Sequence, residues 1–107
     1  MKASPAPGEV WTVDFGYDGK VRSALVVSIP DKNCRLAIST VVQITTQYAG
    51  DTIRSYAAPR SVASEQSYCN AQTVQAVAWV EFQRKLGQFD LRVLKDLRSA
   101  LSLWLGI

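Results

Sequence analysis

Apolar and polar residues alternate with a period of two along the first part of the chain, a pattern typical of half-buried β-strands. Trp11, Val13 and Phe15 share one face of the first such stretch, and Gly16 opens a turn before a second apolar stretch over residues 21–28. Turn residues at that position indicate that the two stretches pair as neighbouring strands.

The pattern continues with a third predicted strand over residues 35–44 and a short strand over residues 52–56. Residues 67–81 contain two short apolar pieces, so we expect two more strands there, with Trp79 in the core.

From Asp90 onward the period changes to three and four residues, which predicts an amphipathic helix with Asp90 as its N-cap and Gly106 as its C-cap. The apolar stripe consists of Leu91, Leu94, Leu97, Leu101, Trp104 and Leu105. Val93, Ala100 and Leu103 widen the stripe, which makes part of it available to a second subunit. Strands followed by one helix predict a mainly β fold, a small antiparallel barrel or curled sheet that the helix closes at one end.

The length of 107 residues, 48% of them hydrophobic, fits one compact domain. We expect residues 1–7 to form a flexible lead-in and residues 8–107 to form that single domain. The sequence has neither a run of about 18 apolar residues nor the apolar stretch of a secretory signal, so we expect a cytoplasmic protein that does not interact with membranes.

Charge and reactive side chains narrow the classes of function. The net charge of +3 permits a polyanionic partner. The sequence contains no histidine, which is the commonest general acid or base near neutral pH and the commonest metal ligand. Cys34 and Cys69 have neither the number nor the spacing of a disulfide scaffold or a zinc site, so we expect reduced thiols, no metal and no cofactor.

Arg22 stands where the second predicted strand begins. Its guanidinium is always protonated and suits bidentate contact with phosphate oxygens, which suggests nucleic-acid chemistry. The alternative is an arginine that only solvates the end of a strand.

Four segments carry a family pattern in the order in which they occur. They are Gly8-Glu9-Val10-Trp11 followed by Val13-Asp14, Gly19-Lys20-Val21-Arg22, Leu25-Val26-Val27-Ser28 and Ile44-Thr45-Thr46-Gln47. Gln72, the segment Arg84-Lys85-Leu86-Gly87 and the final Leu-Trp-Leu-Gly extend the match over nearly the whole chain after residue 7. With this pattern the chain resembles the MazF/PemK family of toxins from type II toxin-antitoxin systems, in the variety with a short loop between the first two strands.

The resemblance implies an SH3-like β-barrel of the MazF/CcdB type with a C-terminal helix. It also implies a homodimeric, sequence-selective and metal-independent endoribonuclease that cleaves single-stranded RNA, such as mRNA, and is neutralised by a cognate antitoxin. By motif, the catalytic residues of the family fall on Arg22 and Thr45.

Cleavage of RNA through its own 2′-hydroxyl forms a phosphorane, and the fixed guanidinium of Arg22 would stabilise its added negative charge. A threonine hydroxyl is a poor base, so we expect Thr45 to orient the reacting groups. Thr46 is its competitor, because neighbouring residues of a strand face opposite ways.

Other roles stay open at this point. Gln72 and Asp18 are further candidates for catalytic or orienting roles, and the 2′-proton has three candidate acceptors: Asp14, Asp18 or water. Cations near an aromatic ring suit a single strand that offers phosphates and stackable bases. The candidates for substrate binding are Lys20, Tyr48, Arg54 and Arg60.

The chain departs from the family pattern in four places. The first loop lacks the acidic residue that some members carry there, unless Asp18 substitutes for it. Ser23 and Gln43 stand where the family usually has proline, and Cys69 and Ala71 stand where certain relatives place a second arginine and an aspartate in acid-base roles. Two alternatives to a nuclease follow: a non-catalytic toxin of the same fold, such as a gyrase poison or an RNA or antitoxin binder, and a plain SH3-like interaction module.

Overall fold

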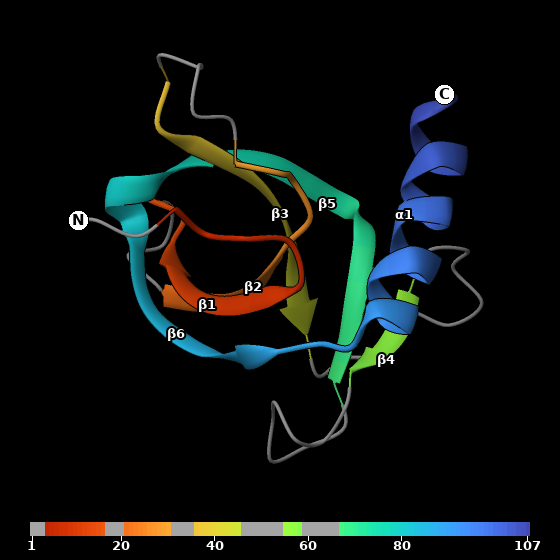
Figure 1. The fold of residues 1–107 in the computed structure, drawn as a ribbon, viewed down its shortest axis with the longest axis horizontal. Coiled ribbons are helices and arrows are strands. Elements are labelled where there is room, and N and C mark those ends of the chain that lie inside the picture. Colours follow the sequence, from red (N-terminus) through yellow and green to blue (C-terminus); the bar gives the residue numbers. More distant parts are fainter. Residues whose placement is uncertain (1–3, 17–20, 31–35, 46–54, 59–66) are drawn as a thin grey trace.

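The computed structural model describes residues 4–16, 21–30, 36–45, 55–58 and 67–107. One antiparallel sheet of six strands, in the order β4-β5-β3-β2-β1-β6, curls around itself, and a C-terminal helix lies against β5 and β4 (Figure 1). The elements are β1 (Glu9–Asp14), β2 (Val21–Val26), β3 (Ile38–Thr45), β4 (Ser55–Ala58), β5 (Ser67–Ala78), β6 (Phe82–Gln88) and α1 (Leu91–Leu105). The predicted curled sheet followed by one helix is confirmed.

Both predicted caps of α1 are confirmed. The Asp90 carboxylate accepts hydrogen bonds from the backbone N–H groups of Arg92 and Val93, at 2.9 and 3.1 Å. Gly106 adopts a left-handed conformation with φ 74°, which a residue without a Cβ adopts at little cost, and ends the helix.

The strand predictions need correction in the second half of the chain. Residues 67–81 form one long strand, β5, followed by a single 3-10 turn at Trp79–Glu81, rather than two strands. The sequence pattern also missed β6, because most of its side chains are exposed and its pairing with β1 is irregular at two points. Such irregularities remove the alternation by which a strand is recognised.

The bounds of two other strands also differ from the prediction. The third strand begins at Ile38 rather than at residue 35, and it ends at Thr45. Of the short strand predicted over residues 52–56, positions 52–54 lie outside the described residues, and β4 continues to Ala58.

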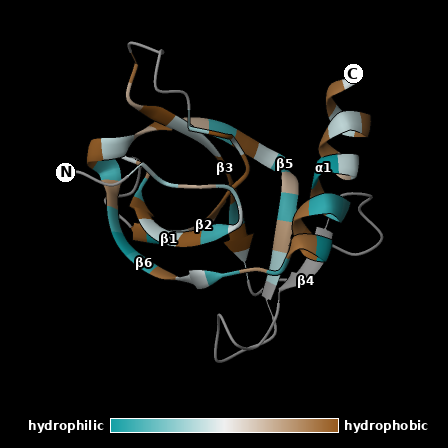
Figure 2. Ribbon diagram, viewed as in Figure 1, coloured by the Kyte–Doolittle hydropathy of each residue, from teal (hydrophilic) through white to brown (hydrophobic). Residues whose placement is uncertain are grey.

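The core consists of two clusters, one on each face of the sheet. The helix-side cluster lies between the sheet and α1 and contains Val10, Leu25, Val27, Val42, Cys69, Ala71, Phe89, Leu94, Leu97, Ala100 and Leu101. The inner cluster lies within the curl and contains Trp11, Val13, Ala24, Val26, Val41, Val77 and Phe82. Figure 2 shows the resulting mixture of hydrophobic and hydrophilic residues along the strands.

Two tryptophans give the inner face both apolar surface and fixed polar contacts. Trp11 meets Phe82 edge to face, with ring centroids 5.8 Å apart, and its indole N–H donates to Glu9 at 2.9 Å. Trp79, partly buried as expected, packs against the inner cluster and donates its indole N–H to Ser39 at 2.9 Å. Buried indoles with satisfied N–H groups fix one arrangement of the core.

The C-terminal helix is only partly covered. Leu94 and Leu97 are buried, whereas the end of the helix exposes a group of large apolar residues: Leu103, Trp104, Leu105 and Ile107. In the part of the chain that the structure describes, no helix has the length and apolar character needed to cross a membrane.

Candidate functional site

The strand register sets Arg22 and Thr45 on the same face of two neighbouring strands. Strands β2 and β3 pair antiparallel, and the hydrogen-bonded ladder ends at Ala24 opposite Gln43. Continuing the same register by two residues sets Arg22 on β2 opposite Thr45 on β3. Directly opposed residues of an antiparallel pair project from the same face of the sheet.

The packing of their neighbours identifies that face. Arg22 is paired with Val13, a member of the inner cluster. Thr45 follows Ile44, which packs against the helix-side cluster, so Thr45 projects to the other side. Both residues therefore lie on the inner face of the sheet, beyond the apolar cluster.

Arg22 is held by regular backbone within β2 and is half-buried, and its Nε atom is buried. A guanidinium positioned in this way loses little conformational freedom when an anion binds, which makes its hydrogen bonds more effective than those of a lysine on a loop.

Three further polar residues share the inner face, and sequence reasoning did not single them out for this site. Tyr68 on β5 is paired directly with Thr45, and Asn70 is paired with Gln43. We call Arg22, Gln43, Thr45, Tyr68 and Asn70 the polar patch. In the structure, strand parity sets Tyr68 and Asn70 on this face, because each is adjacent to Cys69, which is buried on the helix side.

A bulge in β5 borders the polar patch. The ladder passes from Gln43–Asn70 directly to Val41–Gln75, which leaves extra residues on β5. Thr73 fixes the bulge: its hydroxyl donates to the carbonyl of Asn70 at 2.7 Å and accepts from the N–H of Gln43 at 2.8 Å. The Asn70 side chain accepts from the N–H of Gln72 at 2.9 Å.

Gln72 is therefore an exposed residue of this bulge, outside the paired row that carries Thr45 and Tyr68. The structure places it beside the polar patch rather than within it.

Cys69 and Ala71, which depart from the family pattern, lie away from the polar patch. Cys69 and Ala71 are buried in the helix-side cluster, on the opposite face from Arg22. Burial raises the pKa of the Cys69 thiol to about 12, so this cysteine stays protonated at neutral pH. Their strand neighbours Tyr68 and Asn70 lie on the inner face.

Asp14, one candidate acceptor of the 2′-proton, is also on the wrong face. It follows Val13 of the inner cluster, and its carboxylate accepts from the N–H of Gly16 at 2.8 Å. The carboxylate stabilises the turn after β1 and is not brought to Arg22.

The remaining candidates lie outside the described residues: Asp18, Lys20, Thr46, Tyr48, Arg54 and Arg60. Among the residues that are described, no group of three or more His, Cys, Asp or Glu side chains could hold a metal ion.

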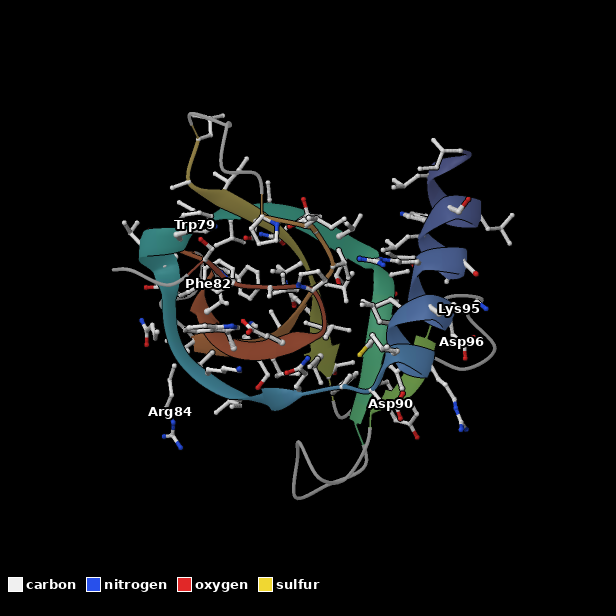
Figure 3. All side chains as sticks on the ribbon, viewed as in Figure 1. Trp79, Phe82, Arg84, Asp90, Lys95 and Asp96 are labelled. Atoms are coloured by element: carbon white, nitrogen blue, oxygen red, sulfur yellow. The ribbon has the colours of Figure 1, made fainter. Side chains whose placement is uncertain are left out.

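Two side chains of β6, Phe82 and Arg84, point to opposite sides of the strand. Phe82 points into the curl of the sheet, and Arg84 points outward to solvent (Figure 3). Lys85 pairs with Glu9 of β1 at 3.2 Å, which ties β6 to the start of β1.

Comparisons with known proteins agree with this architecture. Residues 6–105 match the family model described as PemK-like, MazF-like toxin of type II toxin-antitoxin system. No curated protein sequence matches the chain at a significant level.

Several solved structures are similar over nearly the whole chain. An endoribonuclease in complex with its cognate antitoxin from a mycobacterial species has 25% identity and a TM-score of 0.82, with 96% of each chain covered. MazF from Deinococcus radiodurans has 20% identity and a TM-score of 0.84, covering 99% of this chain and 100% of that one. The Mycobacterium tuberculosis toxin MazF-mt6 has 16% identity and a TM-score of 0.79, covering 92% and 97%.

The fold expected from the sequence, a mainly antiparallel β-structure of the MazF type with a C-terminal helix, is thus confirmed. Because the family model spans almost all of the sequence, from the residues before β1 to the last turn of α1, the chain belongs to the PemK-like, MazF-like toxins of type II toxin-antitoxin systems.

Proposed function

We propose that the protein is an endoribonuclease toxin that cleaves single-stranded RNA, with Arg22 and Thr45 as its catalytic residues. The observation that supports this proposal most directly is the register of β2 and β3: continued two residues beyond its last pair, Ala24 opposite Gln43, it would set Arg22 opposite Thr45 on the inner face. A single phosphodiester can contact both from above the sheet.

The reaction is a transesterification within the RNA. The 2′-oxygen attacks the adjacent phosphorus and the P–O5′ bond breaks, giving a 2′,3′-cyclic phosphate and a free 5′-hydroxyl. Arg22 donates hydrogen bonds to the nonbridging oxygens, where negative charge grows in the transition state, and a preorganised donor of this kind contributes about 3 kcal/mol. Thr45 orients the 2′-hydroxyl and one nonbridging oxygen through its own hydroxyl.

The metal independence and the sequence selectivity of this activity are part of the proposal and come from the family resemblance. Substrate contacts are proposed for Lys20, Tyr48, Arg54 and Arg60. Cations and an aromatic ring of this kind bind the phosphates and bases of a single strand.

We further propose that the protein forms a homodimer and is neutralised by a cognate antitoxin. The exposed apolar residues at the end of α1, which include Leu103 and Trp104, form a surface suited to a protein partner. The net charge of +3 suits an antitoxin segment with acidic residues. Light scattering of the purified toxin, alone and with the antitoxin, gives the mass of each assembly and tests both statements.

The central experiment incubates the purified protein with a long single-stranded RNA in EDTA. The proposal predicts discrete fragments that end in a 2′,3′-cyclic phosphate, a product that phosphatase without cyclic phosphodiesterase activity leaves intact. Uncut RNA in the presence of folded protein contradicts the nuclease proposal and favours the non-catalytic toxin of the same fold.

A further inference from the structure

We propose that Tyr68 is a third catalytic residue, which donates its phenolic proton to the 5′-oxygen as that oxygen leaves. This inference rests on the proposed endoribonuclease function and names a residue for a step that Arg22 and Thr45 do not perform. It starts from the pairing of Tyr68 with Thr45 across β5 and β3.

Position is the first argument. Arg22, Thr45 and Tyr68 come from three consecutive strands of the sheet, β2, β3 and β5, and project from its inner face. Paired strands are about 4.8 Å apart, which sets the spacing of Thr45 and Tyr68, and Arg22 lies on the same face of the next strand, two residues beyond the last pair of β2 with β3. Long side chains on either side of Thr45 can approach one phosphodiester group from different directions.

The chemistry of the leaving group is the second argument. The departing 5′-oxygen would be an alkoxide, a strong base, unless it receives a proton while the P–O5′ bond breaks. A phenol holds its proton at neutral pH and can give it to an alkoxide. The 2′-hydroxyl loses its proton to water, the 5′-oxygen gains the phenolic proton, and the phenolate then recovers a proton from solvent.

The other members of the polar patch cannot supply this proton. Gln43 and Asn70 carry amides, which do not transfer protons at neutral pH, and an aliphatic hydroxyl such as that of Thr45 is a much weaker acid than a phenol. The sequence has no histidine, and the Cys69 thiol is buried on the opposite face. Within the described part of the inner face, Tyr68 is the member of the patch best suited to donate a proton.

The partial burial of Tyr68 fits this role. One of its strand neighbours, Cys69, is fully buried on the helix side, which anchors the backbone of β5 at this point. A side chain on such a backbone is positioned by the sheet rather than by a loop, as a proton donor with a fixed direction requires.

The test compares Tyr68→Phe with the native protein on two versions of one RNA. The first is ordinary RNA, and the second carries sulfur in place of the bridging 5′-oxygen at the cleavage site. A thiolate leaves without protonation, so a variant that lacks only the proton donor recovers its rate on the sulfur substrate. We expect Tyr68→Phe to cleave ordinary RNA about 100-fold or more slowly, and the sulfur substrate within about tenfold of the native rate.

Thr45→Val serves as the matched comparison, because it lies one strand away on the same face and would be slow on both substrates. Equal slowing of Tyr68→Phe on both substrates, or no slowing on ordinary RNA, overturns the assignment. If the native protein cuts neither substrate, the nuclease proposal fails instead, so the two failures are distinguishable.

Incorporation of 3-fluorotyrosine at position 68 gives a second measurement that preserves the ring and the hydroxyl. A more acidic phenol changes the cleavage rate of ordinary RNA but leaves cleavage of the sulfur substrate unchanged. Equal rates of the fluorinated and native proteins on ordinary RNA count against proton donation.

Discussion

The two faces of the sheet divide the work of stability and chemistry between them. The helix-side cluster is made of aliphatic and aromatic residues apart from the thiol of Cys69, and α1 covers it. The inner cluster contains Trp11 and is flanked by Trp79, whose indoles donate hydrogen bonds to Glu9 and Ser39, and the polar patch lies beyond it toward Thr45.

Adjacent residues of one strand show the difference most clearly. Cys69 and Tyr68 are neighbours in sequence, yet Cys69 is fully buried against the helix side and Tyr68 shares a face with Arg22. The raised pKa of Cys69 shows what the helix-side environment does to an ionisable group: burial opposes the charged form. Reactive side chains are useful only on the other face, where an anionic substrate can reach them.

Leu97→Ala should have the largest effect and should act on stability alone. Leu97 is fully buried in the helix-side cluster, and removing its side chain leaves a cavity that lowers the free energy of unfolding by about 2–5 kcal/mol. Urea denaturation measures this loss, with exposed Ser99→Ala on the same helix as the control. A large fall in RNA cleavage per folded molecule would contradict the separation of the two faces.

Arg22→Ala should act on catalysis alone. Loss of one preorganised donor to the phosphorane raises the barrier by about 3 kcal/mol, roughly a hundredfold in rate, while circular dichroism of the variant stays native. Ser23→Ala is the matched control, because Ser23 pairs with Thr12 on the opposite face and its change should leave cleavage unaffected. Near-native cleavage by Arg22→Ala would refute the assignment of Arg22.

The sequence is sufficient to predict α1, its caps and the pairing of β1 with β2. These features depend on local chemistry: Asp90 caps nearby N–H groups, and Gly106 adopts a backbone conformation that suits glycine. The edge strand β6 could not be predicted in this way, because its outward side chains and irregular pairing leave no periodic signal.

The faces of β5 could not be predicted either, because the bulge changes the phase of the strand. Cys69 and Ala71 face the helix side, whereas Val77 faces the inner cluster, although all three have the same parity in sequence. Only the pairing with β3 shows where the phase shifts and that Tyr68 lies opposite Thr45, on the same face as Arg22. The family motif in the sequence was therefore sufficient to propose Arg22 and Thr45 as site residues. It was not sufficient to propose Tyr68.

Thr73→Val tests whether this bulge maintains the polar patch. The substitution preserves the shape of the side chain but removes a hydroxyl that bonds both Gln43 and Asn70. We expect the free energy of unfolding to fall by about 1–2 kcal/mol and RNA cleavage to weaken with it. Thr73→Ser, which keeps the hydroxyl, should lose less, and a valine variant as stable as the native protein would show that the bulge does not need these bonds.

The smallest expected effect concerns Glu9, at the end of β1 away from Arg22. Burial on its own would raise the pKa of Glu9, but hydrogen bonds from Ala6, Trp11 and Lys85, with the charge of Lys85, outweigh it and lower the pKa below its ordinary value. A lowered pKa in the folded state means that the carboxylate stabilises the fold above the ordinary carboxyl pKa. This stabilisation disappears as the pH falls through the lowered pKa.

Glu9→Gln removes the titrating group and keeps the shape of the side chain. Urea midpoints measured from neutral to acidic pH should show the native protein more stable at neutral pH, with the difference from Glu9→Gln shrinking as the pH falls. Lys85→Met isolates the ion pair, which we expect to contribute little because Lys85 is largely solvated. If the difference in stability between the native protein and Glu9→Gln did not change with pH, the hydrogen bonds that Glu9 accepts, rather than its charge, would stabilise the start of β1.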